Sequence, residues 1–205
     1  MKRVHDLLPV IIGLGLGLLA LGAAPGGRAA DNPCLECHAK VVDKPVVHAA
    51  TERSCTKCHR DAKAGVAHDG PGNPPLAKLD DSPKRCLTCH DEAEFAGKFT
   101  HAPVAEGKCL GCHDPHASDY PGLLKAKPAT LCLDCHESVK KGPHMVSGFS
   151  RRGHPLGDGD TQAEDPLRPG NPFYCVACHE PHRSEFRSLL RWDPAQMTCQ
   201  KCHQM

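Results

Sequence analysis

The chain repeats one short string, Cys-x-x-Cys-His, seven times, and these strings contain all fourteen of its cysteines. Two thiols at this spacing followed by a histidine are the attachment signal for haem c, in which both sulfurs form thioethers and the imidazole becomes an axial iron ligand. The strings are Cys34, Cys37, His38; Cys55, Cys58, His59; Cys86, Cys89, His90; Cys109, Cys112, His113; Cys132, Cys135, His136; Cys175, Cys178, His179; and Cys199, Cys202, His203. The sequence therefore predicts seven covalently bound haem c groups.

Paired cysteines have two other common uses, and both fit this chain less well. A disulfide scaffold needs no histidine after each second cysteine. Zinc ribbons join cysteine pairs two by two around a closed tetrahedral site and are usually intracellular. Neither use explains a histidine at the same place in all seven strings, so we favour haem c.

The first 30 residues have the layout of a secretory signal peptide. Two basic residues precede an apolar stretch over 7–24, and the small residues Gly27 and Ala29 suit cleavage at this point. The alternative is a retained membrane anchor, although four glycines within the apolar stretch make a poor membrane helix. We expect an exported protein, located in the periplasm, at the cell surface or outside the cell.

The histidines outside the strings match the irons in number. Apart from His5 in the leader they are His48, His68, His101, His116, His144, His154 and His182. An iron held by one attachment-string imidazole has one open axial position, so seven free histidines suffice for seven haems with two histidine ligands each. Methionine is the alternative sixth ligand, but Met145 directly follows His144, Met197 lies close to a haem cysteine and Met205 ends the chain. We expect low-spin, low-potential haems throughout.

Aligning the chain against itself exposes a doubled unit. Residues 101–136 and 154–203 share a free histidine, two attachment strings, a His-acid-Pro-His run, a serine, an aromatic residue and a Leu-Leu pair, in the same order. A looser third copy over 48–90 has no His-acid-Pro-His run. Adding the opening haem at Cys34 gives the predicted segments 1–30, 31–98, 99–145 and 146–205. His144 is left over, and we expect it to serve the opening haem.

Each His-acid-Pro-His run places two imidazoles three residues apart, at His113 and His116 and again at His179 and His182. Two side chains this close cannot reach around one macrocycle to opposite faces of the same iron. We therefore expect His116 and His182 to bind neighbouring haems, with the intervening proline fixing the turn.

The composition argues against an ordinary hydrophobic core. Aromatic residues make up only 4% of the chain, whereas it contains 19 glycines and 19 prolines. We expect a mostly irregular fold with short α-helices near the haem cysteines, for example over 86–97 and 132–141, and loops over 69–75 and 153–172. Because haem replaces the core, the apoprotein should be largely unfolded.

The charge balance excludes nucleic acid as a partner. Without the leader the chain has 22 basic and 23 acidic residues. Fourteen propionates from seven haems would bring the net charge to about −15 in the reduced protein and about −8 in the oxidised protein. Electron uptake should therefore be coupled to proton uptake, because added negative charge raises the proton affinity of nearby carboxyl groups.

The attachment strings and the His-acid-Pro-His runs resemble those of multihaem c-type cytochromes of the doubled-CxxCH-motif group, over about residues 34–205. The resemblance implies covalent haem c, ligation by two histidines and electron transfer to redox proteins or to an extracellular acceptor. The looser first pair departs from the group's pattern at His68.

Three functions remain open from the sequence. The leading one is an electron carrier without catalytic residues, because an iron with both axial sites filled changes valence without binding a substrate. A multihaem reductase of oxyanions would need one open iron. A structural role, as a subunit of a cytochrome filament or of a porin-cytochrome conduit, would involve homo-oligomers, a porin partner or peripheral contact with a membrane.

Overall fold

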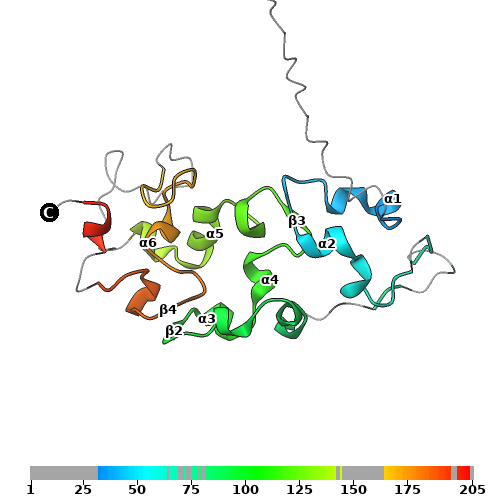
Figure 1. Cartoon of the computed structure of the whole chain (residues 1–205), viewed down its shortest axis with the longest axis horizontal. Coiled ribbons are helices and arrows are strands. Elements are labelled where there is room, and N and C mark those ends of the chain that lie inside the picture. The colour runs from blue at the N-terminus through cyan, green and yellow to red at the C-terminus, as the bar shows by residue number, and fades with distance from the viewer. Residues whose placement is uncertain are drawn as a thin grey trace, which may run out of the picture.

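A computed structural model describes residues 32–63, 65–68, 72, 75–77, 79, 82–141, 144, 164–194 and 198–203. The expected signal peptide, most of the loop over 69–75, and the part of the long loop that contains His154 lie outside the described residues. The described part is elongated, and its segments follow one another along the long axis roughly in chain order (Figure 1).

Short helices account for most of the regular structure, as the sequence predicts, but the segment 86–97, expected to be α-helical, contains 3-10 helices instead. The α-helices are α1 (Leu35–His38), α2 (Ala49–Arg53), α3 (Ala102–Ala105), α4 (Cys109–Cys112), α5 (Pro128–Cys135) and α6 (Ser138–Lys141). The 3-10 helices are η1 (Ala39–Val41), η2 (Cys55–Lys57), η3 (Pro83–Thr88), η4 (Glu92–Glu94), η5 (Pro121–Leu123), η6 (Cys175–Ala177), η7 (Arg187–Leu189) and η8 (Cys199–Lys201). Helix α5 begins before its haem cysteines, because Pro128 at its first turn has the φ that a helix start needs.

Four two-residue strands form two antiparallel ladders that the sequence did not predict. Strand β1 (Val46–Val47) pairs with β3 (Ala117–Ser118), and β2 (Phe99–Thr100) pairs with β4 (Arg183–Ser184). Each ladder joins one predicted segment of the chain to the next. The segments are therefore interlocked in space, although each carries its own haem-attachment strings.

The same turn follows both His-acid-Pro-His runs and explains the repeated serine. Ser118 and Ser184 are buried, at 2% and 6% exposure. Their hydroxyls donate to the carbonyls of Leu124 and Leu190 and accept from the backbone N–H groups of Tyr120 and Phe186 at 3.0 and 2.9 Å. Each serine thereby closes a tight loop behind the run.

Side chains supply almost no core, which confirms the expected fold class. Among the described residues, the buried hydrophobic ones are Ala117, Ala129, Leu133 and Ala177. The interior is instead a connected cavity of about 3660 Å³, lined from Pro33 at one end to His203 at the other. Divided among the seven attachment strings, this volume gives about 520 Å³ to each, within the roughly 300–1,000 Å³ of pockets that hold drug-sized ligands.

Candidate haem sites

Every attachment string adopts one helical turn. In each string the backbone N–H of the histidine donates to the carbonyl of the first cysteine, four residues earlier, at 2.9–3.1 Å. Residues at positions i, i+3 and i+4 share one face of a helical turn. Both sulfurs and the imidazole of each string are therefore presented to the same side, as a haem bound by two thioethers and one axial nitrogen requires.

Each of six string histidines faces a second imidazole that comes from elsewhere in the chain. The ring centroids are 5.4–6.2 Å apart. The pairs, in the order of the strings, are His38 with His68, His59 with His116, His90 with His48, His113 with His182, His136 with His101, and His179 with His144.

The spacing of these pairs fits an iron atom between the rings. Rings in direct stacking contact would lie at about 3.5–4 Å, the optimal separation of carbon atoms. Two metal–nitrogen bonds of about 2 Å each, plus the distance from nitrogen to ring centre on each side, account for a separation of about 6 Å. With the cysteine pair beside one ring of each pair and the apolar cavity around it, the residues fit haem c.

Hydrogen bonds at the Nδ1 atom orient several of these imidazoles. The Nδ1 atoms of His48 and His101 bond to the carbonyls of Pro115 and Pro181, at 2.8 and 2.9 Å. The Nδ1 atoms of His113 and His179 bond to the carbonyls of Gly122 and Ser188, which lie within the two serine turns, each at 2.7 Å. A donor hydrogen on Nδ1 leaves the Nε2 lone pair available for a metal.

The His-acid-Pro-His runs tie together strings that are distant in the sequence. In the first run, His116 faces His59, and its carbonyl accepts the backbone N–H of His48 at 2.8 Å. In the second run, His182 faces His113, and its carbonyl accepts the N–H of His101 at 3.0 Å. The second histidine of each run therefore faces the string histidine two strings earlier in the sequence. Its carbonyl also binds the free histidine that faces the string in between.

The structure agrees with one expectation for the free histidines and corrects another. His116 and His182 both face imidazoles outside their own runs, as three-residue spacing requires. The prediction that His144 serves the opening haem is wrong, because His144 faces His179 and the opening His38 faces His68. His68 is held to the carbonyl of Val66 at 3.0 Å through Nδ1. His154 lies outside the described residues.

Burial favours the neutral, metal-binding form of three imidazoles. Burial lowers the pKa of His59, His144 and His182 below the usual value for histidine. A second imidazole adds to the effect in each case, because two nearby imidazolium charges would repel each other. Since a metal competes with a proton for the same nitrogen, these sites favour the metal.

Cysteines of consecutive strings lie near one another, which the sequence did not reveal. Burial raises the pKa of the Cys34 and Cys86 thiols, and the neighbouring Cys55 and Cys109 respectively raise it further. A hydrogen bond with Cys175 raises the pKa of Cys132 and lowers that of Cys175 to about 7.

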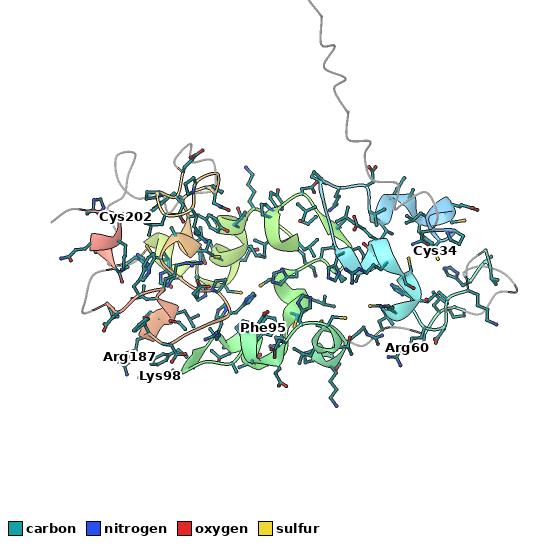
Figure 2. All side chains as sticks on the ribbon, viewed as in Figure 1. Cys34, Arg60, Phe95, Lys98, Arg187 and Cys202 are labelled. Carbon is teal, nitrogen blue, oxygen red and sulfur yellow. The ribbon has the colours of Figure 1, made fainter. Side chains whose placement is uncertain are left out.

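Cysteines of the other consecutive strings also affect one another's pKa. Cys58 adds to the upward shift of the Cys86 pKa, Cys135 to that of Cys112, and Cys202 to that of Cys178, in each case after burial. The seven strings therefore adjoin in sequence order. Cys34 and Cys202 lie near opposite ends of the long axis (Figure 2).

A buried ion pair stands beside the last two strings and was missed by sequence reasoning. Asp165 is 2% exposed and accepts from Arg168 at 2.6 Å and from the backbone N–H of Leu167 at 2.9 Å. Its charge contributes to the raised pKa of the Cys178 and Cys202 thiols. Only the tertiary structure brings this carboxylate to the haem cysteines.

The described residues form neither a disulfide nor a cluster of ligands for a lone metal ion. All fourteen cysteines are free of disulfides. Within the described ranges, no three or more His, Cys, Asp or Glu side chains converge on a point that could hold a lone metal ion. The described helices also include none that is both long and apolar enough to span a bilayer.

Comparison with known proteins finds doubled attachment motifs in two segments of the chain. A family model described as "Doubled CXXCH motif" matches residues 101–141 and 165–205, within the two segments that carry the His-acid-Pro-His runs. The chain is 31% identical to the multiheme cytochrome MtrA of Shewanella baltica, over 86% of this chain and 53% of that protein.

A second relative is the C-type polyheme cytochrome OmcC of Geobacter sulfurreducens, which is 25% identical over 89% of this chain and 27% of that protein. The chain thus spans about half the length of the first relative and about a quarter of the second. The attachment turns, the facing imidazoles and these similarities converge on covalently bound haem. The chain belongs to the multihaem c-type cytochromes that carry doubled CXXCH motifs.

Proposed function

We propose that the protein is a seven-haem electron carrier in which every iron has two histidine ligands. The observation that carries the proposal is the set of six facing imidazole pairs, each of which joins a string histidine to a free histidine at 5.4–6.2 Å. The seven cysteine pairs are the covalent attachment points. Similarity to two multihaem cytochromes supports the same function.

The sequence repeat supports a seventh ligand pair, His154 with His203. His48, His101 and His154 occupy the same place in the three copies of the sequence repeat, ahead of a haem pair. His48 and His101 face the second string of their own copies, so the repeat supports His154 as the ligand opposite His203.

The residues of the chain are arranged for electron transfer without a substrate bound at the iron. When bound, haem supplies an iron that takes one electron from a reduced donor protein and passes it to an oxidised acceptor, with no bond made or broken. The paired histidines would hold the iron from both sides, which would keep it low-spin and closed to substrates. The ladders β1–β3 and β2–β4 hold the histidines of neighbouring strings in register.

The order of the attachment strings supports a linear path through the molecule. Consecutive strings adjoin from Cys34 to Cys202, and these two cysteines lie near opposite ends of the long axis (Figure 2). We infer that electrons enter near one end and leave near the other, toward redox proteins or an extracellular acceptor. The layout of residues 1–30 supports export to the periplasm or the cell surface.

A reductase would need at least one iron with an open position. Six of the seven string histidines face a second imidazole in the described part of the chain, so the geometry favours the carrier. A role as a filament subunit or in a porin conduit is compatible with the same ligand set, and electron microscopy of the purified holoprotein would reveal a filament.

Intact-protein mass and a low-temperature electron paramagnetic resonance spectrum together test the proposal. The expected result is seven covalently attached haems and ferric signals that integrate to low-spin iron alone. Nitrite added to the oxidised protein serves as the matched challenge and should leave the spectrum unchanged. Fewer than seven haems, or a high-spin signal that shifts stoichiometrically with nitrite, would overturn the carrier in favour of a reductase.

A further inference from the structure

One aromatic ring lies between imidazoles of two adjacent candidate haem sites, those of the third and fourth strings. Phe95 meets His90 of the third string edge-on, with ring centroids 6.4 Å apart and planes at 69°. It also meets His182 edge-on, at 5.3 Å and 71°. His182 is the imidazole that faces His113 of the fourth string. Phe95 lies near the middle of the elongated molecule (Figure 2).

The imidazole pair beside Phe95 differs in orientation from most of the others. The planes of His182 and His113 are inclined at 42°. In four other pairs the planes lie within 11–22° of each other. The remaining described pair, His144 with His179, is inclined at 59° and includes the histidine that no repeat supplies.

The chain contains its own comparison for the effect of Phe95. His116 and His182 are equivalent, since each ends a His-acid-Pro-His run, precedes a ladder strand and accepts a backbone N–H from the free histidine of the preceding copy. Phe95 lies six residues before His101, and Val42 lies six residues before His48. The plane of His116 lies at only 11° to its partner ring.

We propose that Phe95 is a positioning residue that sets the plane of the His182 imidazole and thereby gives the haem attached at Cys109 and Cys112 its own electronic character. An edge-on aromatic contact restrains rotation of the imidazole about its bond to the iron. Val42, a smaller and non-aromatic side chain, provides no such contact at the equivalent place. The proposal rests on the ligand assignment in the proposed function.

The orientation of two axial imidazoles can be read in the spectrum of ferric haem. Parallel rings donate to the same iron d orbital and separate it in energy from its partner. Inclined rings donate to both orbitals and leave them closer in energy, so the g values become more anisotropic. The wild-type holoprotein should therefore show more strongly anisotropic low-spin signals from the haems at His113 and His179 than from the four haems with near-parallel rings.

The test is the Phe95→Val variant, which introduces the side chain found six residues before His48, compared with wild type as oxidised holoproteins. We expect the loss of one strongly anisotropic signal and the gain of one rhombic low-spin signal, with the signal from His179 retained. Phe95→Tyr, which keeps the ring, should retain the wild-type spectrum. Phe99→Val is the matched control, because the Phe99 ring lies on β2 under the Lys98 ammonium at 5.7 Å.

Val42→Phe gives the reciprocal test and should convert one rhombic signal into an anisotropic one. It also keeps the proposal testable if Phe95→Val yields no mature holoprotein. An unchanged low-spin spectrum in Phe95→Val, or an equal change in Phe99→Val, would overturn the role of Phe95 while leaving the carrier intact. A high-spin signal in the wild-type protein would instead overturn the ligand assignment.

Discussion

Replacing His116 with alanine should open a single iron, the one attached at Cys55 and Cys58. The His116 ring lies 5.9 Å from the ring of His59, on the opposite side of the site for that iron. The backbone of residue 116 also has a structural role, since its carbonyl accepts the N–H of His48 at 2.8 Å. Alanine keeps this carbonyl, so the His48 ligand should stay in place.

The expected magnitude follows from the one-to-one pairing. One iron of seven, about 14% of the ferric signal, should become high-spin in His116→Ala, and the other six should stay low-spin. The assay is quantitative electron paramagnetic resonance of the oxidised protein, supported by titration of the reduced protein with carbon monoxide, which should bind once per molecule.

The matched variant His182→Ala identifies which haem has opened. His116→Ala should remove a rhombic signal, because the His59 pair is inclined at only 11°, whereas His182→Ala should remove an anisotropic one, because the His113 pair is inclined at 42°. If His116→Ala removed the anisotropic signal, or opened two irons, the interlocked ligand pattern would be refuted.

Three further predictions concern stability and charge. Ser184→Ala should lower the free energy of unfolding by about 1–3 kcal/mol in denaturant titrations, because a buried carbonyl and N–H lose their partner, and an unchanged midpoint would contradict the role of the serine turn. Gly107→Ala should lower the free energy of unfolding by more than about 1–2 kcal/mol, since φ is +70° and the added Cβ would lie 2.5 Å from Pro83. Gly122→Ala is the control, because φ is +69° but the added Cβ would enter open space. Equal losses of stability in the two variants would exclude the clash as the cause. Redox titrations should give midpoint potentials that fall as the pH rises through the carboxyl range, since reduction adds negative charge that protons offset, and pH-independent potentials would refute this coupling.

The attachment sites could be predicted from the sequence because their chemistry is local. One helical turn brings Cys175, Cys178 and His179 to one face, and this turn needs no distant contact. The scarcity of aromatic residues likewise predicted a fold without a conventional core, and the structure confirms it. The divergence of His116 from its own run also followed locally, from three-residue spacing.

Pairing between distant histidines could not be predicted in the same way. His144 faces His179 and not the opening string, because the chain after α6 returns to the sixth string while His68 folds back onto the first. The ladders that bring His48 to the first run and His101 to the second contain only two residues per strand, too few to leave a readable pattern.

Asp165 and Phe95 illustrate the same division. Neither stands in a motif. Phe95 meets the ring of His182, and the charge of Asp165 acts on the Cys202 thiol, and both partners lie far along the chain. The sequence by itself determined which atoms can bind haem and how many haems they suggest, since bonding capacity belongs to residue type and local spacing. The tertiary structure decided which imidazoles share a site and at what angle they meet, because these depend on how the backbone returns on itself.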